Sequence, residues 1–381
     1  MRILFVIDKM QNYAGIERIL SCKMNYISEQ TTHNVFLTTY DQQSKGLPFQ
    51  LHDKILYQPI HVPMPLRNKM TMTCWLKSYI QARCQFKRLF LSLLNEIRPD
   101  IVICTVYSFQ VLDIIINVCH KQSIRTIMES HTKGETVTMA HKFKYNRHLH
   151  KLLSLWDHHI MKSLHYCSCV VTLTRQDVPF WQRYTRRIEV IPNMLTITPK
   201  SVSDYGVKRV ISAGRYMSEK GFDRLLKAWN LINDSLCDWE LYIFGNGDRT
   251  PYQKIVDRLQ LGENIHLMPA TEDIAEEFSK SSIDVMSSRY EGFGLVLAEA
   301  MSCGLPCISF DCPYGPREII TDGEDGLLAE NGNIEVLAQK IEQLMSDEEL
   351  RKDMGTKAIQ NISRFKPETI MAQWINLFNS I

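Results

Sequence analysis

The sequence has little that would assign it at once to a secreted, membrane-spanning or zinc-binding class. Its eleven cysteines are scattered without the double Cys-x-x-Cys spacing of a structural zinc site. No apolar run approaches the ~20 residues needed to cross a bilayer, and residues 2–7 read directly as a strand rather than as a signal peptide. We therefore expect a protein that stays inside the cell with its thiols reduced.

Cofactor and metal signatures are also missing. No Gly-x-Gly-x-x-Gly fingerprint follows the first strand pattern, and in residues 245–250, which come close, Thr250 takes the third glycine position. Asp322, Glu324 and Asp325 lack the ordered ligand spacing of a calcium loop and read better as a turn. These absences disfavour a nicotinamide or flavin enzyme, and we expect neither a cofactor nor a bound metal.

The charges that are present divide the chain in two. Residues 1–195 contain 25 Lys and Arg against 13 Asp and Glu, a net charge of +12, whereas residues 196–381 contain 19 against 29, a net charge of −10. A chain of 381 residues is too long for one ordinary core, which predicts roughly two domains. The basic half is expected to face an anionic surface or acceptor that the acidic half does not.

Short Val- and Ile-rich runs alternate with amphipathic stretches, which is typical of strand-helix-strand units and parallel sheets. This alternation predicts an α/β protein with two doubly wound, Rossmann-like domains in tandem. The clearest strands are expected at 2–7, 34–40, 101–106, 124–129 and 169–174, and then at 208–213, 239–244, 264–268, 283–286 and 306–310.

The domain boundary is expected where Pro192 and Asn193 stop a strand before a Thr-, Ser- and Pro-bearing segment. This places the first domain at residues 1–195 and the second at 196–365. Residues 366–381 carry apolar side chains at helical spacing, so we expect a last helix that either covers core or packs back on the first domain.

The segment from 289 to 300 is the most informative part of the chain. Glu291 and Glu299 lie eight positions apart, the first followed by two glycines around a phenylalanine and the second inside an apolar run that reads as helix. A glycine-bracketed turn that enters a helix brings backbone amides, and the partial positive charge of the helix start, close to an anion. The pattern favours a nucleotide-sugar site; the alternative is an ordinary strand, loop and helix with one exposed and one capping glutamate.

Residues 212–223 carry two cations in a glycine-containing loop between a strand and a helix. Arg215 and Lys220 can converge on a diphosphate there, the arginine through a forked contact and the lysine as a point charge. The alternative is that both are solvated, as arginine and lysine in surface loops usually are. The diphosphate reading gains from Glu291 and Glu299, because both segments would lie at the carboxyl ends of strands in one open sheet, where ligands bind.

Two residues of the first half, Gly15 and His131, also follow expected strands. Gly15 lies in a turn between strand 2–7 and an amphipathic helix, where it either permits close approach of a ligand or serves only the turn. His131 follows strand 124–129, where it would face the crevice and orient the transferred sugar or share in acid-base chemistry, unless it is structural or solvated.

Basic stretches with interleaved aromatic and aliphatic residues run over 67–90 and 141–156. Such amphipathic segments lie on anionic membrane surfaces, where each Lys or Arg adds on the order of 1 kcal/mol. The alternative is a pair of ordinary domain helices with a solvated basic face. No helix-turn-helix, RNP-type or zinc-finger pattern supports nucleic acid as the partner.

These motifs together resemble glycosyltransferase family 4, whose members are retaining enzymes of the GT-B fold, built from two facing Rossmann-like domains. The resemblance covers nearly the whole chain and is most specific over 208–330; residues 41–95 match nothing in it. Residues 310–320 resemble a version found in bacterial hexosaminyl- and galactosyltransferases of surface-glycan and lipid-linked oligosaccharide assembly. In the N-terminal glycine turn, Ala14 replaces the first glycine of a commoner Gly-Gly pair.

The resemblance implies a role for each matched residue. Arg215 and Lys220 would hold the donor diphosphate, Glu299 would bind its ribose, and Glu291 would contact the donor sugar. His131 matches a sugar-contacting histidine, so that Glu291, His131, Arg215 and Lys220 would form the catalytic set. The other donor-binding positions would be Gly15, Gly214, Gly292, Phe293, Gly294 and Leu295, and this class of enzyme needs no bound metal.

We therefore expect an enzyme that moves a hexose or N-acetylhexosamine from a UDP-sugar to a membrane-linked saccharide, with retained anomeric configuration, in surface polysaccharide or lipopolysaccharide assembly. The domain at 1–195 would bind the acceptor and the domain at 196–365 the nucleotide sugar. The enzyme would be cytoplasmic and peripheral at the inner face of the cell membrane, with its basic half on anionic lipid. Two alternatives are a nucleotide-sugar epimerase of the same architecture and a non-catalytic, membrane-bound protein that binds nucleotide sugars.

Overall fold

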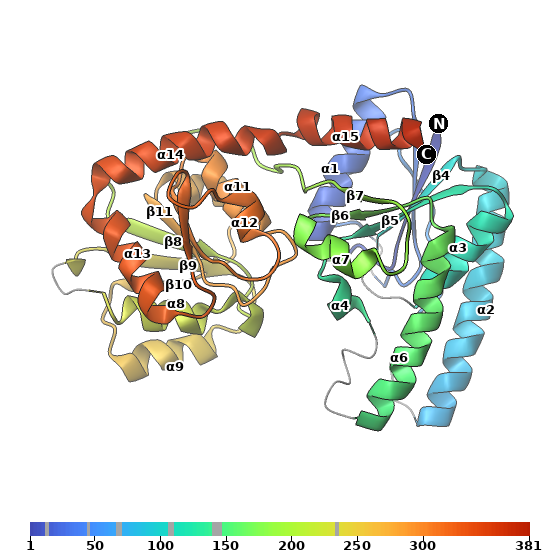
Figure 1. The fold of residues 1–381 in the computed structure, drawn as a ribbon, viewed down its shortest axis with the longest axis horizontal. Coiled ribbons are helices and arrows are strands. Elements are labelled where there is room, and N and C mark those ends of the chain that lie inside the picture. The colour runs from blue at the N-terminus through green and yellow to red at the C-terminus, as the bar shows by residue number, and fades with distance from the viewer. Residues whose placement is uncertain (12–14, 44–45, 66–70, 106–109, 139–146, 233–235) are drawn as a thin grey trace. The chain divides into compact units, whose positions relative to one another are not determined.

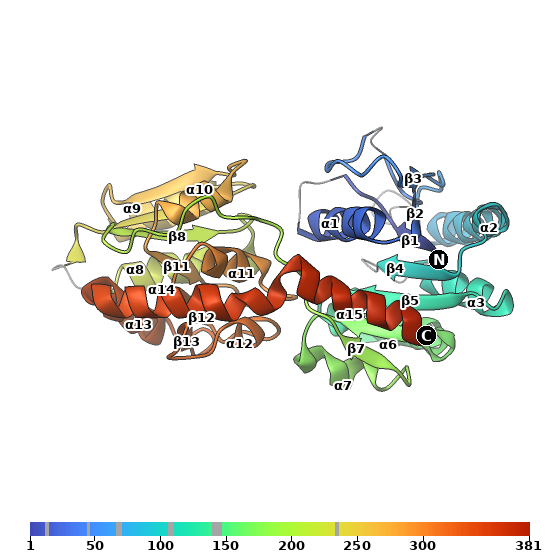
Figure 2. The same ribbon diagram turned by 90° about the horizontal axis from the view of Figure 1, so that it is seen from above.

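The computed structural model describes residues 1–11, 15–43, 46–65, 71–105, 110–138, 147–232 and 236–381. These residues form two compact units, each built on a parallel β-sheet with helices packed against it (Figures 1 and 2). The first unit comprises Met1–Pro192 and Ile370–Ile381, and the second comprises Asn193–Thr369. Two α/β units with doubly wound parallel sheets confirm the expected fold class.

The first unit has a seven-stranded parallel sheet with the order β3-β2-β1-β4-β5-β6-β7. Its strands are β1 (Arg2–Ile7), β2 (Asn34–Thr39), β3 (Leu56–Tyr57), β4 (Ile101–Thr105), β5 (Arg125–Ser130), β6 (Cys169–Thr172) and β7 (Ile188–Val190). Its helices are α1 (Gly15–Gln30), α2 (Met72–Ile97), α3 (Leu112–Lys121), α4 (Gly134–Val137), α6 (Arg147–Lys162) and α7 (Val178–Trp181), with 3-10 turns η2 (Ser163–Tyr166) and η3 (Arg175–Asp177).

Helices cover both faces of this sheet, which explains why its central strands are continuous apolar runs rather than alternating ones. On one face, α2, α3, α6 and α7 enclose a core that includes Phe86, Phe90, Ile116, Ile160 and Trp181. The other face is covered by α1 and by the C-terminal helix α15 (Pro367–Ser380), as both views show (Figures 1 and 2).

The second unit has a six-stranded parallel sheet with the order β10-β9-β8-β11-β12-β13. Its strands are β8 (Arg209–Ala213), β9 (Glu240–Gly245), β10 (Ile265–Pro269), β11 (Ile283–Met286), β12 (Cys307–Phe310) and β13 (Gly326–Ala329). Its helices are α8 (Phe222–Trp229), α9 (Thr250–Leu259), α10 (Ile274–Ser279), α11 (Leu295–Ser302), α12 (Pro316–Ile319), α13 (Ile334–Ser346) and α14 (Glu348–Ile362), with 3-10 turns η4 (Ser218–Lys220) and η6 (Ser363–Phe365).

All ten expected strands are present, with ends shifted by at most two residues; residue 106, the expected end of one, lies outside the described residues. Three further strands, β3, β7 and β13, were not expected. They have only two, three and four residues and lie at sheet edges. So short a run carries too little periodicity for a prediction. The expected terminal helix is present as α15, and no helix in the described part of the chain is long and apolar enough to span a bilayer.

In each sheet the strand order reverses once, between β1 and β4 in the first unit and between β8 and β11 in the second. The loops that leave two such neighbouring strands diverge to opposite faces, so a crevice opens at their carboxyl ends. Ligands of open α/β sheets bind at this switch point. The loop after β8 contains Arg215 and Lys220, and the loop after β11 contains Glu291. The topology therefore places both predicted donor-binding segments at one crevice.

Candidate active site

Hydrogen bonds connect the loop that carries Lys220 to the segment that follows β11. Arg289 donates two hydrogen bonds to the carboxylate of Asp223, each 2.8 Å long, and one of 2.7 Å to the carbonyl of Ser218. These bonds from Arg289 lower the pKa of Asp223. The hydroxyl of Ser287 donates to the carbonyl of Lys220 over 3.0 Å. The two loops therefore hold a single arrangement in which Lys220 and Glu291 face each other.

Gly221 permits this close approach. Its φ is +65°, and a Cβ added there would lie 2.1 Å from the carbonyl oxygen of Ser287. No other residue fits without moving the backbone, because the obstacle is a main-chain atom. Gly214 permits the close approach of a side chain, since a Cβ on it would lie 3.2 Å from the methylene carbons of Lys220. The two glycines therefore allow the loop, and the side chain of Lys220 on it, to pack closely against the neighbouring backbone.

Lys220 and Glu291 form an ion pair at the centre of the site. The ammonium group lies 2.7 Å from Oε1 of Glu291, and the same oxygen accepts a 2.6 Å hydrogen bond from the hydroxyl of Ser288. The side chains are 22% and 11% exposed, so solvent reaches the lysine. The structure thus brings together two of the predicted catalytic residues and adds Ser288, which the sequence analysis did not single out.

Arg215 lies in the same loop and is exposed. Its charge acts on Tyr290, the residue before Glu291, whose pKa is raised chiefly by burial and lowered in part by Arg215. An exposed guanidinium beside a half-buried lysine provides two cations for one anionic group. The geometry is therefore compatible with the predicted diphosphate contact of Arg215 and Lys220.

Helix α11 begins at the same crevice. Its N-cap is Gly294, with φ +91°, and the first N–H groups of the helix, from Leu295 onward, have no partner within the helix itself. These groups and the helix dipole form an anion-binding end. The side chain of Phe293 is 3% exposed and packs edge-on against Phe365, at 5.3 Å between ring centroids. It anchors the turn, and only its backbone is available to a ligand; Gly292 is half-buried in the same turn.

Glu299 projects from α11 and is 3% exposed. Its Oε1 accepts a 2.6 Å hydrogen bond from the hydroxyl of Thr196, 103 positions earlier in the chain. A carboxylate has about four lone-pair positions, so one that already accepts a hydrogen bond can accept others, for example from a vicinal diol. Thr196 is a second residue that sequence reasoning missed, because nothing in a local pattern indicates a partner so far away.

In the first unit, Gly15 is the exposed first residue of α1. Ala14, the departure from the Gly-Gly pair, lies outside the described residues. His131 follows β5, but its side chain is only 1% exposed and its Nε2 lies 3.1 Å from Oε1 of Glu129. Glu129 also forms an ion pair with Lys23 of α1. Burial raises the pKa of Glu129, and the opposing effect of Lys23 and His131 brings it down to about 2.

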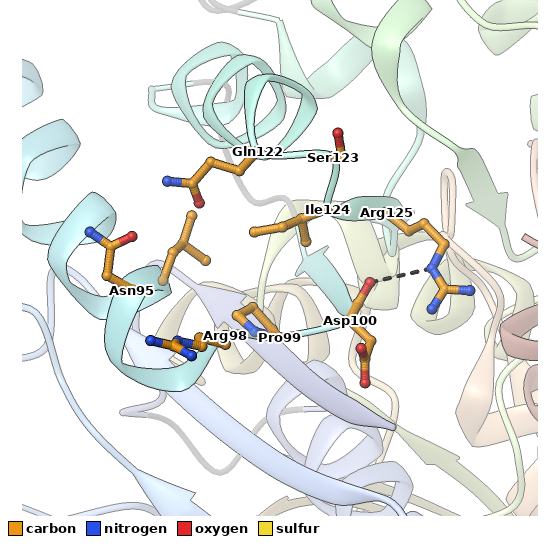
Figure 3. Close-up of a pocket in the computed structure, with 9 residues that line it drawn as sticks. Asn95, Arg98, Pro99, Asp100, Gln122, Ser123, Ile124 and Arg125 are labelled. Carbon is orange, nitrogen blue, oxygen red and sulfur yellow. Dashed lines mark hydrogen bonds between the residues drawn. The ribbon is translucent and has the colours of Figure 1, made fainter.

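Among the described residues, neither a metal cluster nor a hollow in the first unit competes with this site. In the described part of the chain no group of three His, Cys, Asp or Glu side chains could hold a metal ion. A hollow of about 490 Å³ lies in the first unit where β4 and β5 begin (Figure 3). Ligands of open parallel sheets bind at the opposite ends of the strands. Arg125, in this hollow, is already bonded to the carbonyls of Asp100 and Ile381.

Residues 195–361 match the family model described as glycosyl transferases group 1. A curated relative, the amylovoran biosynthesis glycosyltransferase AmsD of Erwinia amylovora, is 26% identical over 99% of both chains. An uncharacterized glycosyltransferase of Haemophilus influenzae is 32% identical over 212 residues, 55% of this chain and 60% of that protein. The chain thus spans less than two thirds of the Haemophilus protein but almost all of AmsD.

Three solved structures have a similar fold. Sucrose-phosphate synthase from Thermosynechococcus elongatus has a TM-score of 0.78 at 16% identity, over 100% of this chain and 98% of that one. The lipopolysaccharide outer core galactosyltransferase WaaB has a TM-score of 0.73 at 18% identity, over all of both chains. A variant of Staphylococcus aureus TarM, in complex with UDP, alpha-GlcNAc-glycerol and fondaparinux, has a TM-score of 0.60 at 25% identity, over 76% of this chain and 58% of that one.

The two doubly wound sheets, the match of the second unit to a transferase family and the match of the whole chain to AmsD all point the same way. The chain is therefore a glycosyltransferase of the GT-B fold, and its residues 195–361 match the group 1 glycosyl transferases.

Proposed function

We propose that this enzyme transfers a hexose or N-acetylhexosamine from a UDP-sugar to a membrane-linked saccharide in surface-glycan assembly, with retention of the anomeric configuration. The observation that carries the proposal is the Lys220–Glu291 pair beside the first turn of α11, at the switch point between β8 and β11. A cation, a carboxylate and the first backbone amides of a helix are the groups that a diphosphate joined to a sugar requires.

The diphosphate is the leaving group of the transfer, so its negative charge grows as the bond to the anomeric carbon breaks. Arg215, Lys220 and the amides from Leu295 onward stabilise that charge where it develops. Cationic side chains and amides replace the divalent ion that other transferases use, and we propose that no bound metal is needed. Transfer that continues undiminished in excess chelator is the expected result; loss of transfer that added Mg²⁺ or Mn²⁺ restores would contradict it.

We propose that the carboxylates of Glu299 and Glu291 bind the two remaining parts of the donor, the ribose and the transferred sugar. Glu299, oriented by the hydrogen bond from Thr196, accepts further hydrogen bonds from the ribose hydroxyls. Glu291 contacts the sugar, and it can do so only after Lys220 has moved from the carboxylate to the diphosphate. Ser288 then keeps Glu291 oriented, because its 2.6 Å hydrogen bond does not involve the lysine.

The relatives support the choice of donor and process without deciding either. AmsD is named for amylovoran biosynthesis, WaaB for the lipopolysaccharide outer core, and the TarM variant was solved with UDP. Each name describes the relative that bears it and not this chain. The shared process is polysaccharide assembly, and we propose the same process for this chain, at the cytoplasmic face of the membrane.

The proposed membrane contact is the face formed by α2 and α6, which lie side by side (Figure 1). Tyr79 of α2 meets Trp156 of α6, with ring centroids 6.4 Å apart. Around this contact, exposed apolar side chains stand among exposed lysines: Leu76, Ile80, Leu155 and Trp156 are 48%, 51%, 66% and 36% exposed, and Lys77, Lys87 and Lys151 are exposed.

Acidic residues are scarce on the two helices, since α2 contains only Glu96 and α6 only the buried Asp157. An exposed surface that is both cationic and apolar fits anionic lipid. Lys142 and Lys144 of the predicted basic stretch, and Arg67 and Lys69 of the other, lie outside the described residues. Vesicles rich in phosphatidylglycerol at low salt should sediment the wild-type chain, and Ile80→Ser with Leu155→Ser should weaken sedimentation; Leu231→Ser, at an exposed leucine of the other unit, is the matched control.

The transfer itself is tested with a panel of labelled UDP- and GDP-sugars and a glycolipid extract as acceptor. Lys220→Ala and Glu291→Gln should each lower kcat/KM by about 10²- to 10³-fold, the usual cost of losing a group that stabilises transition-state charge. Lys254→Ala and Glu272→Gln, at exposed positions of the same unit, should leave it unchanged. Wild-type rates in both site variants would place the reaction elsewhere. Release of an altered nucleotide sugar without acceptor would instead indicate an epimerase, and binding with no turnover a non-catalytic protein.

A further inference from the structure

Lys23 and Glu129 form an ion pair with almost no access to solvent. Lys23 belongs to α1 and Glu129 to β5, and the two residues are 2% and 1% exposed. The Nζ of Lys23 also lies 3.8 Å from the ring centroid of Trp374 on α15. The second carboxylate oxygen of Glu129 accepts a 3.4 Å hydrogen bond from Thr105. A helix after the first strand, the centre of the sheet and the C-terminal helix therefore meet at one buried charge.

Stability alone is a poor explanation of this pair. Removing two charges from water costs several kcal/mol per ion, and well-packed apolar residues of similar volume are often as stabilising. Cation–π contact with Trp374 recovers part of that cost. The position of Glu129 suggests another purpose, because the oxygen that pairs with Lys23 is also the one that lies 3.1 Å from Nε2 of His131.

We propose that Lys23 and Glu129 are positioning residues that hold the imidazole of His131 in one orientation and one tautomer, and that Trp374 of the C-terminal helix keeps Lys23 in place. This inference rests on the proposed function insofar as His131 contacts the transferred sugar. An ionised carboxylate can only accept hydrogen bonds. Facing Glu129, Nε2 must therefore carry the proton, which leaves Nδ1 as a bare acceptor.

The state of Nδ1 agrees with a site that waits for a donor. Within the described residues, this atom is buried and has no hydrogen-bond partner. Nε2, although close to Glu129, is not aligned with it well enough for a full hydrogen bond. Catalytic hydrogen bonds are often long or misaligned in the free enzyme and tighten when substrate binds. A sugar hydroxyl is the kind of donor that a bare imidazole nitrogen accepts.

Lys23 is needed because burial favours the protonated form of Glu129. Without a neighbouring cation the buried carboxyl would keep its proton, and a neutral carboxylic acid can donate as well as accept. Glu129 would then no longer select a tautomer of His131. With Lys23 present the pKa of Glu129 is about 2, so the carboxylate is an acceptor throughout the working range of pH.

The tautomer can be measured directly on the full-length chain labelled with ¹⁵N-histidine, since the shifts of Nδ1 and Nε2 distinguish the protonated nitrogen. His131→Gln identifies the signals. The wild-type chain should show the Nε2–H form of His131. Lys23→Met should give a mixture of tautomers, and Lys162→Met, at an exposed lysine of the same unit, should leave the wild-type pattern. An Nδ1–H form in the wild type, or an unchanged pattern in Lys23→Met, would overturn the inference.

Lys23→Met leaves the buried carboxyl group of Glu129 without its cationic partner, which can destabilise the fold. A second variant therefore controls for misfolding. Lys23→Met with Glu129→Gln has no buried charge and also lacks the tautomer selector, so it should show the same mixture while melting cooperatively; a pure Nε2–H form there would equally refute the inference. In transfer assays both variants should lose about 10- to 100-fold in kcat, as expected for a misplaced group, with donor KM within twofold. Trp374→Leu should follow them and Trp374→Phe should not. A clear tautomer change in a chain that transfers no sugar would keep this inference and refute the proposed function.

Discussion

Glu291 has two partners in turn, and this makes a counter-intuitive prediction about UDP. In the free enzyme its carboxylate holds the ammonium group of Lys220 at 2.7 Å, so binding a diphosphate must first break that pair. Glu291→Gln removes the competitor without changing the size of the side chain. We therefore expect Glu291→Gln to bind free UDP more tightly than the wild type, although it transfers sugar more slowly.

The magnitude follows from the surroundings of the pair. Exposed ion pairs contribute about 0.2–1 kcal/mol, whereas removing one partner of a buried pair costs about 3–5 kcal/mol. With side chains 22% and 11% exposed, Lys220 and Glu291 lie between these cases, so about 1 kcal/mol is a reasonable value. At 25 °C this corresponds to roughly fivefold tighter binding of UDP.

Isothermal titration calorimetry of UDP into the wild type, Glu291→Gln, Lys220→Ala and the double variant tests this as a thermodynamic cycle. Lys220→Ala should weaken UDP binding by roughly 10- to 100-fold, because a charge-assisted hydrogen bond to phosphate is lost. In the Lys220→Ala background, Glu291→Gln should no longer tighten binding, since there is no lysine left to release. Weaker UDP binding by Glu291→Gln, or an equal gain in both backgrounds, would refute the idea that the two groups compete.

Three further predictions concern single structural features. Gly221→Ala should destabilise the second unit by roughly 1–3 kcal/mol and weaken UDP binding, because its φ of +65° and the carbonyl of Ser287 leave no room for a Cβ; Gly323→Ala, which has the same sign of φ but open space around it, is the control for melting temperature. The pKa of Glu129 is depressed in the folded chain to about 2, so the stability that its ionised form contributes is present above its ordinary value near 4.5 and is lost as pH falls toward 2; acid melting curves should show this loss in the wild type and not in Lys23→Met with Glu129→Gln. Thr196→Val should lower affinity for UDP by about twofold to tenfold by removing the hydrogen bond that orients Glu299, whereas equal affinity for UDP would indicate that the carboxylate does not bind ribose.

Much of the fold could be predicted from the sequence because parallel strands covered on both faces are continuous apolar runs. All of β1, β4, β8 and β11 could be recognised in this way, and their order along the chain already indicated two doubly wound sheets. Strands β3 and β7 could not, because an edge strand of two or three residues is defined by its neighbour rather than by its own sequence.

The candidate site, too, could be predicted only in part from the sequence. Lys220 and Glu291 could be expected to lie near each other, because each follows a strand of the same parallel sheet and the carboxyl ends of those strands lie at one edge. Their catalytic roles, and that of Arg215, stay predictions. Ser288 and Thr196 were missed because a serine or threonine becomes a carboxylate partner only through its place in the folded chain. The same is true of Lys23, which reads as one residue of an amphipathic helix but is buried against Glu129, 106 positions away.

The most direct test of the central claim is a structure of the full-length chain with UDP bound. We predict the diphosphate at the carboxyl ends of β8 and β11, with Lys220 turned from Glu291 to a phosphate oxygen and the amide of Leu295 within hydrogen-bonding distance. UDP bound anywhere else, or bound there with Lys220 still paired to Glu291, would contradict the account.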